Sequence, residues 1–389
     1  MSVRVGVLVR EAVIVDAVRT PIGKRNGMLA EHHPVDLLAH VLNGLVERNG
    51  LDPERLDDVI GGCVTQVGEQ GVNVTRNAVV AAGLPHTVPA TSVDRQCGSS
   101  QQAVSFAAQG VIAGAYDLVI ACGTESMTRA PMASNAKGGT GPFPPSFMAA
   151  CDGQLKNQFE VAQHMANEWG ITREELDELA LESHRRAAAA TDSGFFDREI
   201  LPLDGLNEDE GIRRNTSIEI LAKLPSANWR PEDAPDITAG NSSQMSDGAA
   251  GMVIADRAFA EANGLPIRAA IRHMTVAAES AIWVLTAPNR ATRRLLERSG
   301  MMIEDFDAFE VNEAFAAVTL AWVREFQPDM KRLNPRGGAI ALGHPLGASG
   351  VRLMMTMLNH LEATGGRFGF QTMCEGGGQA NATVIERLG

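Results

Sequence analysis

The feature that most constrains the fold is a trace of internal duplication at an offset of 250 positions. The segment Glu47-Arg48-Asn49-Gly50 matches Glu297-Arg298-Ser299-Gly300, and Asp57 matches Asp307. In both places a helical pattern ends at the glycine, a short loop follows, and an apolar strand begins. The pattern predicts two similar halves rich in βαβ units and related by a pseudo-two-fold axis. Side chains at their strand–helix turns would then converge in one crevice.

Cys97 lies at one such turn, directly before a predicted helix of small residues that ends near Gly114. The free N–H groups and the positive dipole end at the start of a helix favour a thiolate over a thiol. We therefore expect Cys97 to be a nucleophile. The alternative is a buried structural cysteine, and a second stretch of similar design weighs against that alternative.

The second stretch, GGAIALGHPLGASG at residues 337–350, places His344 in a glycine-rich turn. Residues 339–342 read as a strand before the turn, and a helical pattern follows it as far as residue 361. The next apolar run, residues 368–373, leads to Cys374. The corresponding run in the first half, residues 117–121, leads to Cys122. The duplication therefore predicts that Cys97 and His344 occupy corresponding points of the two halves.

The composition excludes several classes of protein. The chain has 389 residues, 44% hydrophobic and 21% charged, which is typical of a soluble globular protein with more than one domain. It contains no run of eighteen apolar residues, so we expect no membrane span. A net charge of −13 argues against nucleic acid as a partner.

Cysteine usage points to the compartment and against a metal. Five widely spaced cysteines, an odd number, fit a reducing cytoplasm better than a disulfide framework. Neither CxxC nor HExxH occurs, so the sequence predicts no metal site.

The two halves differ by an insertion in the first. Residues 127–149 are rich in proline, glycine, serine and methionine and read as a loop. Helical patterns follow at residues 159–169 and 173–190, the second with Thr172 as its N-cap. We expect an N-terminal half at residues 11–267, with an inserted loop domain at about 127–237, and a C-terminal half at residues 268–389.

Four motifs, in this order and at these separations, resemble those of the thiolases, of the acetyl-CoA C-acyltransferase (3-ketoacyl-CoA thiolase) kind. The resemblance covers residues 11–388. It implies the thiolase fold, an α/β fold of two βαβαβαββ halves in a five-layered αβαβα core, with a loop domain inserted in the first half. The four motifs are Asp94-Arg95-Gln96-Cys97-Gly98-Ser99, Asn312-Glu313-Ala314-Phe315, Gly343-His344-Pro345 and Cys374-Glu375-Gly376.

The resemblance also implies catalytic roles. Cys97 would take the acyl group as a thioester, and His344 would be the base that activates it. Cys374 would be the second acid and base. Asn312 would position a water that helps His344 hold the thioester oxygen, and the N–H groups of Cys97 and Gly376 would form a second oxyanion hole. Coenzyme A would be a co-substrate, with no tightly bound cofactor.

The implied activity is thiolytic cleavage of a 3-ketoacyl-CoA by CoA to acetyl-CoA and a shortened acyl-CoA, as in fatty acid or steroid β-oxidation. The alternatives are a biosynthetic acetoacetyl-CoA thiolase (acetyl-CoA C-acetyltransferase), a decarboxylating ketosynthase, and a non-catalytic acyl-CoA or lipid-binding protein of thiolase type. Cys374 in its CEGGG turn argues against a ketosynthase. The resemblance further implies a homodimer or a homotetramer.

Substrate contacts are carried over at four positions. Arg213 resembles an arginine near the CoA nucleotide, with a solvated surface arginine as the alternative, and Ser243 resembles a serine near the pantetheine arm. Gln158 and Phe159 replace a smaller pair of the common thiolases and would shape the acyl pocket. The DRQCGSSQQ segment resembles thiolases that degrade branched, long or steroid-derived acyl chains.

Overall fold

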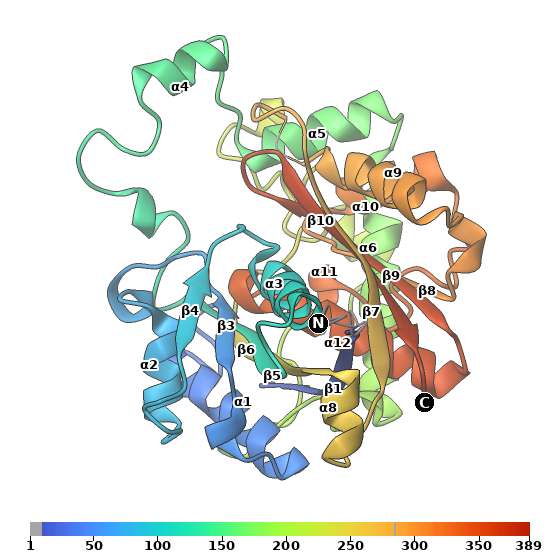
Figure 1. Ribbon diagram of the computed structural model, residues 1–389. Coiled ribbons are helices and arrows are strands. Elements are labelled where there is room, and N and C mark those ends of the chain that lie inside the picture. The colour runs from blue at the N-terminus through green and yellow to red at the C-terminus, as the bar shows by residue number, and fades with distance from the viewer. Residues whose placement is uncertain (1–9, 284) are drawn as a thin grey trace, which may run out of the picture.

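The computed structural model describes residues 10–283 and 285–389, which form twelve α-helices around one ten-stranded sheet (Figure 1). The strand order is β4-β3-β5-β6-β1-β7-β10-β9-β8, and the short β2 pairs with β6. The strands are β1 (Ala12–Arg19), β2 (Gly23–Lys24), β3 (Asp58–Gly62), β4 (Ala90–Val93), β5 (Leu118–Ser126), β6 (Ser246–Asp256), β7 (Ala269–Ala278), β8 (Ala308–Val311), β9 (Phe368–Glu375) and β10 (Gln379–Arg387).

The helices pack on both faces of this sheet (Figure 1). They are α1 (Pro34–Asn49), α2 (Val74–Ala81), α3 (Ser99–Ala113), α4 (Pro145–Ala150), α5 (Gln158–Glu168), α6 (Arg173–Asp192), α7 (Ile218–Leu221), α8 (Arg257–Ala262), α9 (Ala287–Ser299), α10 (Ala316–Phe326), α11 (Ala339–Leu342) and α12 (Ser349–Thr364).

The sheet topology confirms the duplication. In the first half β3 is parallel to β5, β5 is antiparallel to β6, and β6 is antiparallel to β1. In the second half β8, β9, β10 and β7 repeat these relations in the same order. The counterpart of β4 is reduced to a single parallel bridge between Phe309 and Leu333. The two halves join where β1 pairs with β7 over two residues.

The matching residues of the two halves have the same structural roles. Gly50 and Gly300 end α1 and α9 in the left-handed conformation, at φ 56° and 70°. Asp57 accepts two backbone hydrogen bonds at the start of β5, and Asp307 accepts two at the start of β9. Each aspartate thus ties the loop before one strand to the beginning of its neighbour.

Five layers result from this arrangement. Helices α3 and α12 lie at the centre and pack against each other; α3 contacts strands of the first half, and α12 contacts strands of both halves (Figure 1). Helices α1 and α2 cover the outer side of the first half, and α9 packs against β7 and β10 on the outer side of the second. The small residues of α3 allow this close packing at the centre. Those that pack against α12 are buried.

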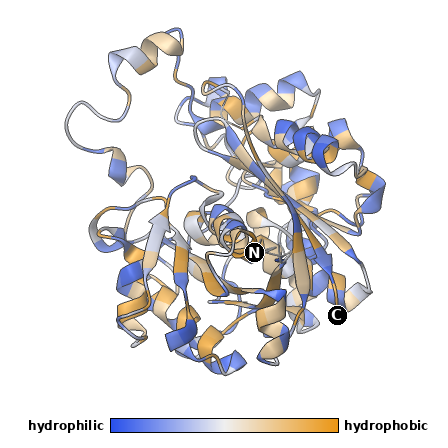
Figure 2. Cartoon of the chain, in the orientation of Figure 1, coloured by the Kyte–Doolittle hydropathy of each residue, from blue (hydrophilic) through white to orange (hydrophobic). Residues whose placement is uncertain are grey.

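Hydropathy follows these layers. Hydrophobic residues concentrate in the strands and along the inner sides of the helices, whereas α9 shows a strongly hydrophilic outer side (Figure 2). Within the described residues, no helix combines the length and the apolar character needed to cross a bilayer.

The inserted region carries α4 to α7. The loop that bears α4 projects away from the body of the molecule (Figure 1). Helix α6 starts with a capping box in which the Thr172 side chain accepts from the Glu175 N–H and the Glu175 carboxylate accepts from the Thr172 N–H. The limits of the insertion and of the two halves stay a prediction.

One local prediction was wrong. The apolar run Ala339–Leu342, expected as a strand, is the short helix α11, whose residues are all buried. Hydrogen bonds from Leu342 N–H to the Gly338 carbonyl and from Gly343 N–H to the Ala339 carbonyl close the turn. A short run that is buried on every side has no periodicity to distinguish strand from helix. Cys122 and Cys374, expected after strands, lie within β5 and β9.

Candidate active site

Cys97 lies in the turn that joins β4 to α3, with Gly98 as the N-cap of the helix. Its side chain packs against Val64, Met127 and Leu346. Cys97 is only half-buried, whereas the other four free cysteines are buried. A reagent can therefore reach Cys97 more readily than any other cysteine of the described chain.

His344 lies between α11 and α12 and is 3% exposed. Its Nδ1 is 2.6 Å from the Ser349 hydroxyl, which itself donates to the Pro345 carbonyl at 2.8 Å. Ser349 must then accept from the Nδ1–H, so the lone pair of the ring is on Nε2. Asn312 Nδ2 lies 3.3 Å from that Nε2 atom, and Asn312 Oδ1 is buried without a hydrogen-bond partner among the described residues.

Cys374 is fully buried near the end of β9 and lies close enough to Cys97 for the two thiols to interact electrostatically. Gly376 begins the glycine turn after β9, and its backbone N–H and that of Cys97 favour the charged form of the Cys97 sulfur. The structure thus brings Cys97, Cys374 and Gly376 together. Their catalytic roles remain predictions.

The turns that carry Cys97 and His344 pack against each other. The Ser100 hydroxyl accepts from the Val351 N–H at 3.0 Å, which links the starts of α3 and α12. A Cβ atom on Gly350 would lie 2.2 Å from the Gln101 nitrogen, so only glycine allows this approach. The two halves therefore meet at the turns that carry Cys97 and His344.

Burial sets the protonation states of the reacting groups. Desolvation raises the pKa of Cys97 to about 12, with Glu375 as the largest charge contribution. Desolvation and the nearby Arg352 lower the pKa of His344 to about 3, and burial raises the pKa of Cys374 well above its ordinary value. Cys97 is therefore a neutral thiol and His344 a neutral imidazole at neutral pH. The expected stable thiolate at the helix start is wrong, because desolvation outweighs the helix dipole.

Three further residues organise the site and were assigned no role from sequence. Ser349 fixes the tautomer of His344. Glu125 accepts from the N–H groups of two residues after β3 and from Gly347 N–H, which ties the His344 turn to the first half. Glu313 accepts from Ser183, Asn334 and the Ile340 N–H and so holds α11 in place. Ser349 is five residues after His344 in the same motif, a spacing that could have indicated it.

The candidate substrate contacts lie at different depths. Phe159 packs edge-on against Phe315 at 5.5 Å, in the same hydrophobic cluster as Cys374. Ser243 donates its N–H to the Ala314 carbonyl and so lies beside the loop between β8 and α10. Arg213 is exposed, and Gln158 is exposed at the first position of α5. The structure places Phe159 in the cluster that includes Cys374 and Ser243 beside Ala314, and it does not place Gln158 in a packed pocket.

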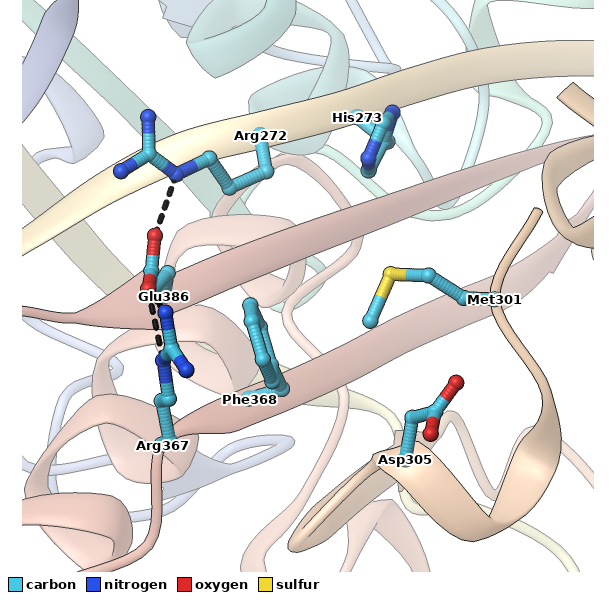
Figure 3. A pocket seen from close by; sticks show the side chains of 7 residues that line it. All are labelled: Arg272, His273, Met301, Asp305, Arg367, Phe368 and Glu386. Carbon is cyan, nitrogen blue, oxygen red and sulfur yellow. Dashed lines mark hydrogen bonds and ion pairs between the residues drawn. The ribbon is translucent and has the colours of Figure 1, made fainter. Parts of the chain in front are cut away.

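A surface pocket of about 440 Å³ lies elsewhere, on the second half (Figure 3). Its two arginines both pair with Glu386, so their charges are already compensated. No catalytic candidate lines it. The lining residues are Arg272, His273, Met301, Asp305, Arg367, Phe368 and Glu386.

Comparison with known proteins agrees with this geometry. Residues 12–258 match the family model "Thiolase, N-terminal domain", and residues 265–387 match "Thiolase, C-terminal domain". The steroid 3-ketoacyl-CoA thiolase FadA6 of Mycobacterium tuberculosis is 44% identical, over 98% of this chain and 96% of its own. The beta-ketoadipyl-CoA thiolase of Pseudomonas aeruginosa is 41% identical, over 97% and 100%.

A solved structure shows the same similarity. The acetyl-CoA acetyltransferase of Bacillus anthracis superposes with a TM-score of 0.87 at 34% identity, over 98% of this chain and 99% of that one. Family models and relatives both extend over almost the whole sequence. The chain belongs to the thiolase family.

Proposed function

We propose that this protein is a 3-ketoacyl-CoA thiolase that cleaves its substrate with CoA to give acetyl-CoA and a shortened acyl-CoA. The observation that carries the proposal is that the turn with Cys97 packs against the turn with His344, with Cys374 close to Cys97. Relatives at 40–44% identity bear the name 3-ketoacyl-CoA thiolase, which supports the same reaction.

The protonation states suit this chemistry. His344 Nε2 takes the proton of Cys97 as the sulfur attacks the ketone carbon, and the N–H groups of Cys97 and Gly376 stabilise the oxyanion. Cleavage of the carbon–carbon bond releases the enolate of acetyl-CoA. Cys374, held as a thiol by burial, protonates its alpha carbon. The Cys374 thiolate then takes the proton of the CoA thiol, and the CoA sulfur attacks the acyl carbon. Cys97 leaves as a thiolate and regains its proton from His344.

Two alternatives share this site. A biosynthetic acetoacetyl-CoA thiolase would use the same groups in the opposite direction, and the similar solved structure is an acetyl-CoA acetyltransferase. A non-catalytic acyl-CoA-binding protein would lack at least one reactive residue, whereas Cys97, His344 and Cys374 are all present. The named steroid thiolase among the relatives favours a bulky acyl chain as the substrate.

The test is the turnover of a panel of straight, branched and ring-bearing 3-ketoacyl-CoA substrates, with free CoA and with the mass of Cys97 followed in parallel. We expect thiolysis together with an acyl adduct on Cys97. Turnover confined to acetoacetyl-CoA would favour the biosynthetic alternative. Absence of any adduct on a folded protein would favour the binding protein.

Phe159 is expected to select the acyl chain because it packs against Phe315 beside Cys374. Phe159→Gly removes a half-buried ring and should change the ranking of substrates by about tenfold, a difference of about 1.4 kcal/mol. Labelling of Cys97 by acetyl-CoA should change less. The matched control is Gln158→Ala at the neighbouring exposed position, and an equal effect of both variants would contradict a pocket role for Phe159.

We further propose that CoA is held by Arg213 and Ser243, and that the protein forms a homodimer or homotetramer in the cytoplasm. The projecting loop around α4 exposes Met132, Phe143 and Leu155, which are apolar side chains that a neighbouring copy could cover. Light scattering at micromolar concentration should give a mass of two or four chains. A stable monomer would contradict the oligomer.

A further inference from the structure

Glu375 is a fully buried carboxyl group that directly follows Cys374 in the chain, at the end of β9. Its Oε1 atom occupies the space beneath the nucleophile turn. A Cβ atom on Gly98 would lie 1.9 Å from that oxygen, so the absence of a side chain at position 98 makes room for the carboxyl group. Glu375 therefore supports the turn that presents Cys97.

Glu375 is poorly supplied with hydrogen-bond donors. With its amide oriented to satisfy both neighbours, Asn381 donates to Oε1 at 3.1 Å and accepts from the Gln102 N–H. Glu375 Oε2 has no partner among the described residues. Glu125, an equally buried carboxyl group near the same site, accepts from three backbone N–H groups and the Gln70 amide.

Charged neighbours do not compensate for this lack. Arg95 is the nearest cation, but its guanidinium donates to Gln379 at 2.7 Å, and no ion pair within the described chain reaches Glu375. The remaining titratable groups that face Glu375 are Asp94, Cys97 and Cys374, and none of them is cationic. An ionised carboxylate in this position would be a buried charge without an ion-pair partner, which is strongly unfavourable.

We propose that Glu375 is a positioning residue that acts on Cys97 as an uncharged carboxylic acid, and that its ionisation at alkaline pH suppresses the Cys97 thiolate. The inference rests on the proposed role of Cys97 as the nucleophile. An uncharged Glu375 fills the space under Gly98 without opposing the negative charge that develops on the sulfur during attack. Desolvation also raises the pKa of Glu375 well above its ordinary value, in agreement with this placement.

The test measures the rate of Cys97 alkylation by iodoacetamide between pH 6 and pH 10, by mass analysis of the Cys97 peptide. Glu375→Gln keeps the shape of the side chain but cannot ionise. We expect the ratio of its rate to the wild-type rate to rise with pH, from about one near pH 6 to about tenfold near pH 9, which corresponds to a pKa difference of about one unit.

Two results would overturn the proposal. A ratio of about ten at every pH would mean that Glu375 is ionised in the resting enzyme, and a ratio of about one at every pH would mean that it does not act on Cys97. Asp94→Asn is the matched control, because it removes a carboxylate three residues before Cys97 that acts on Glu375 but not on the Cys97 sulfur, so its ratio should stay below that of Glu375→Gln.

The result can be distinguished from a folding defect and from a failure of the proposed thiolase activity. Thermal unfolding checks that Glu375→Gln is folded, and Glu375→Met supplies a second uncharged side chain of similar length if it is not. Alkylation by iodoacetamide requires neither CoA nor an acyl substrate. The pH dependence can therefore be measured even if the thiolysis assay of the wild-type protein fails, so failure of the two proposals is distinguishable.

Discussion

Replacing Cys97 with alanine is expected to abolish both acyl transfer onto the enzyme and thiolysis, whereas replacing Cys374 with alanine should abolish only thiolysis. Cys97 is the half-buried thiol at the start of α3, with two N–H groups directed at its sulfur. Transfer of an acetyl group from acetyl-CoA to this sulfur requires no proton at a carbon atom. Cys374→Ala should therefore still be acetylated.

Thiolysis differs because it expels a carbanion equivalent. The enolate of acetyl-CoA must be protonated, and Cys374 is the buried thiol that burial keeps protonated. Loss of this acid should lower thiolysis by about 10²–10⁴-fold. The measurement is the intact mass after incubation with acetyl-CoA, beside a thiolysis assay. Acetylation of Cys97→Ala together with failure of Cys374→Ala to label would reverse the two roles.

Cys63→Ala is the control for the loss of a thiol. Cys63 is fully buried next to β3, and desolvation strongly raises its pKa, so it should not react. Its replacement removes one sulfur atom from the core. We expect a small loss of stability, on the order of 1 kcal/mol, and full acetylation of Cys97.

The sequence predicted the duplicated architecture because its markers are local and chemically specific. A glycine in the left-handed conformation and an aspartate that accepts two N–H groups leave the same trace at positions 50 and 57 as at 300 and 307. Motif order and resemblance together indicated the two turns that pack against each other, those of Cys97 and His344. Apolar runs carried less information, and α11 was taken for a strand because burial on all sides removes periodicity.

Electrostatics could not be predicted from local position. The helix start suggested an acidic Cys97 thiol. Desolvation and Glu375 instead raise the pKa of this thiol, and Glu375 is almost 280 positions away in the sequence. The role of Ser349 depends on a hydrogen bond whose direction is fixed by the Pro345 carbonyl.

Gln158 was expected beside Phe159 in the pocket, yet successive residues of a helix point about 100° apart, and Gln158 is exposed.

Replacing His344 with alanine is expected to slow acetylation of Cys97 and thiolysis together, by about 10²–10⁴-fold, because the neutral thiol then has no base. Ser349→Ala is the graded variant. It keeps the imidazole but removes the acceptor of the Nδ1–H at 2.6 Å, so the ring no longer has a fixed tautomer. We expect a smaller loss, about tenfold, in both reactions.

The pH dependence of stability tests the same assignment without catalysis. The pKa of His344 is about 3 in the folded protein, against an ordinary value of 6.5, so the unfolded chain binds this proton more readily. The stability that His344 contributes is present above pH 6.5 and is lost as the pH falls toward 3. The difference in unfolding free energy between wild type and His344→Ala should therefore narrow over that window.

Denaturant unfolding at pH 7 and at pH 5 measures this change. His184 and His360 also have pKa values lowered to about 4 by burial, and burial lowers the pKa of His273, so the wild-type protein loses stability with acid through four histidines and the variant through three. A constant difference between the two proteins at both pH values would mean that His344 is solvated in the folded state. Wild-type rates of acetylation in His344→Ala would show that another group is the base of Cys97.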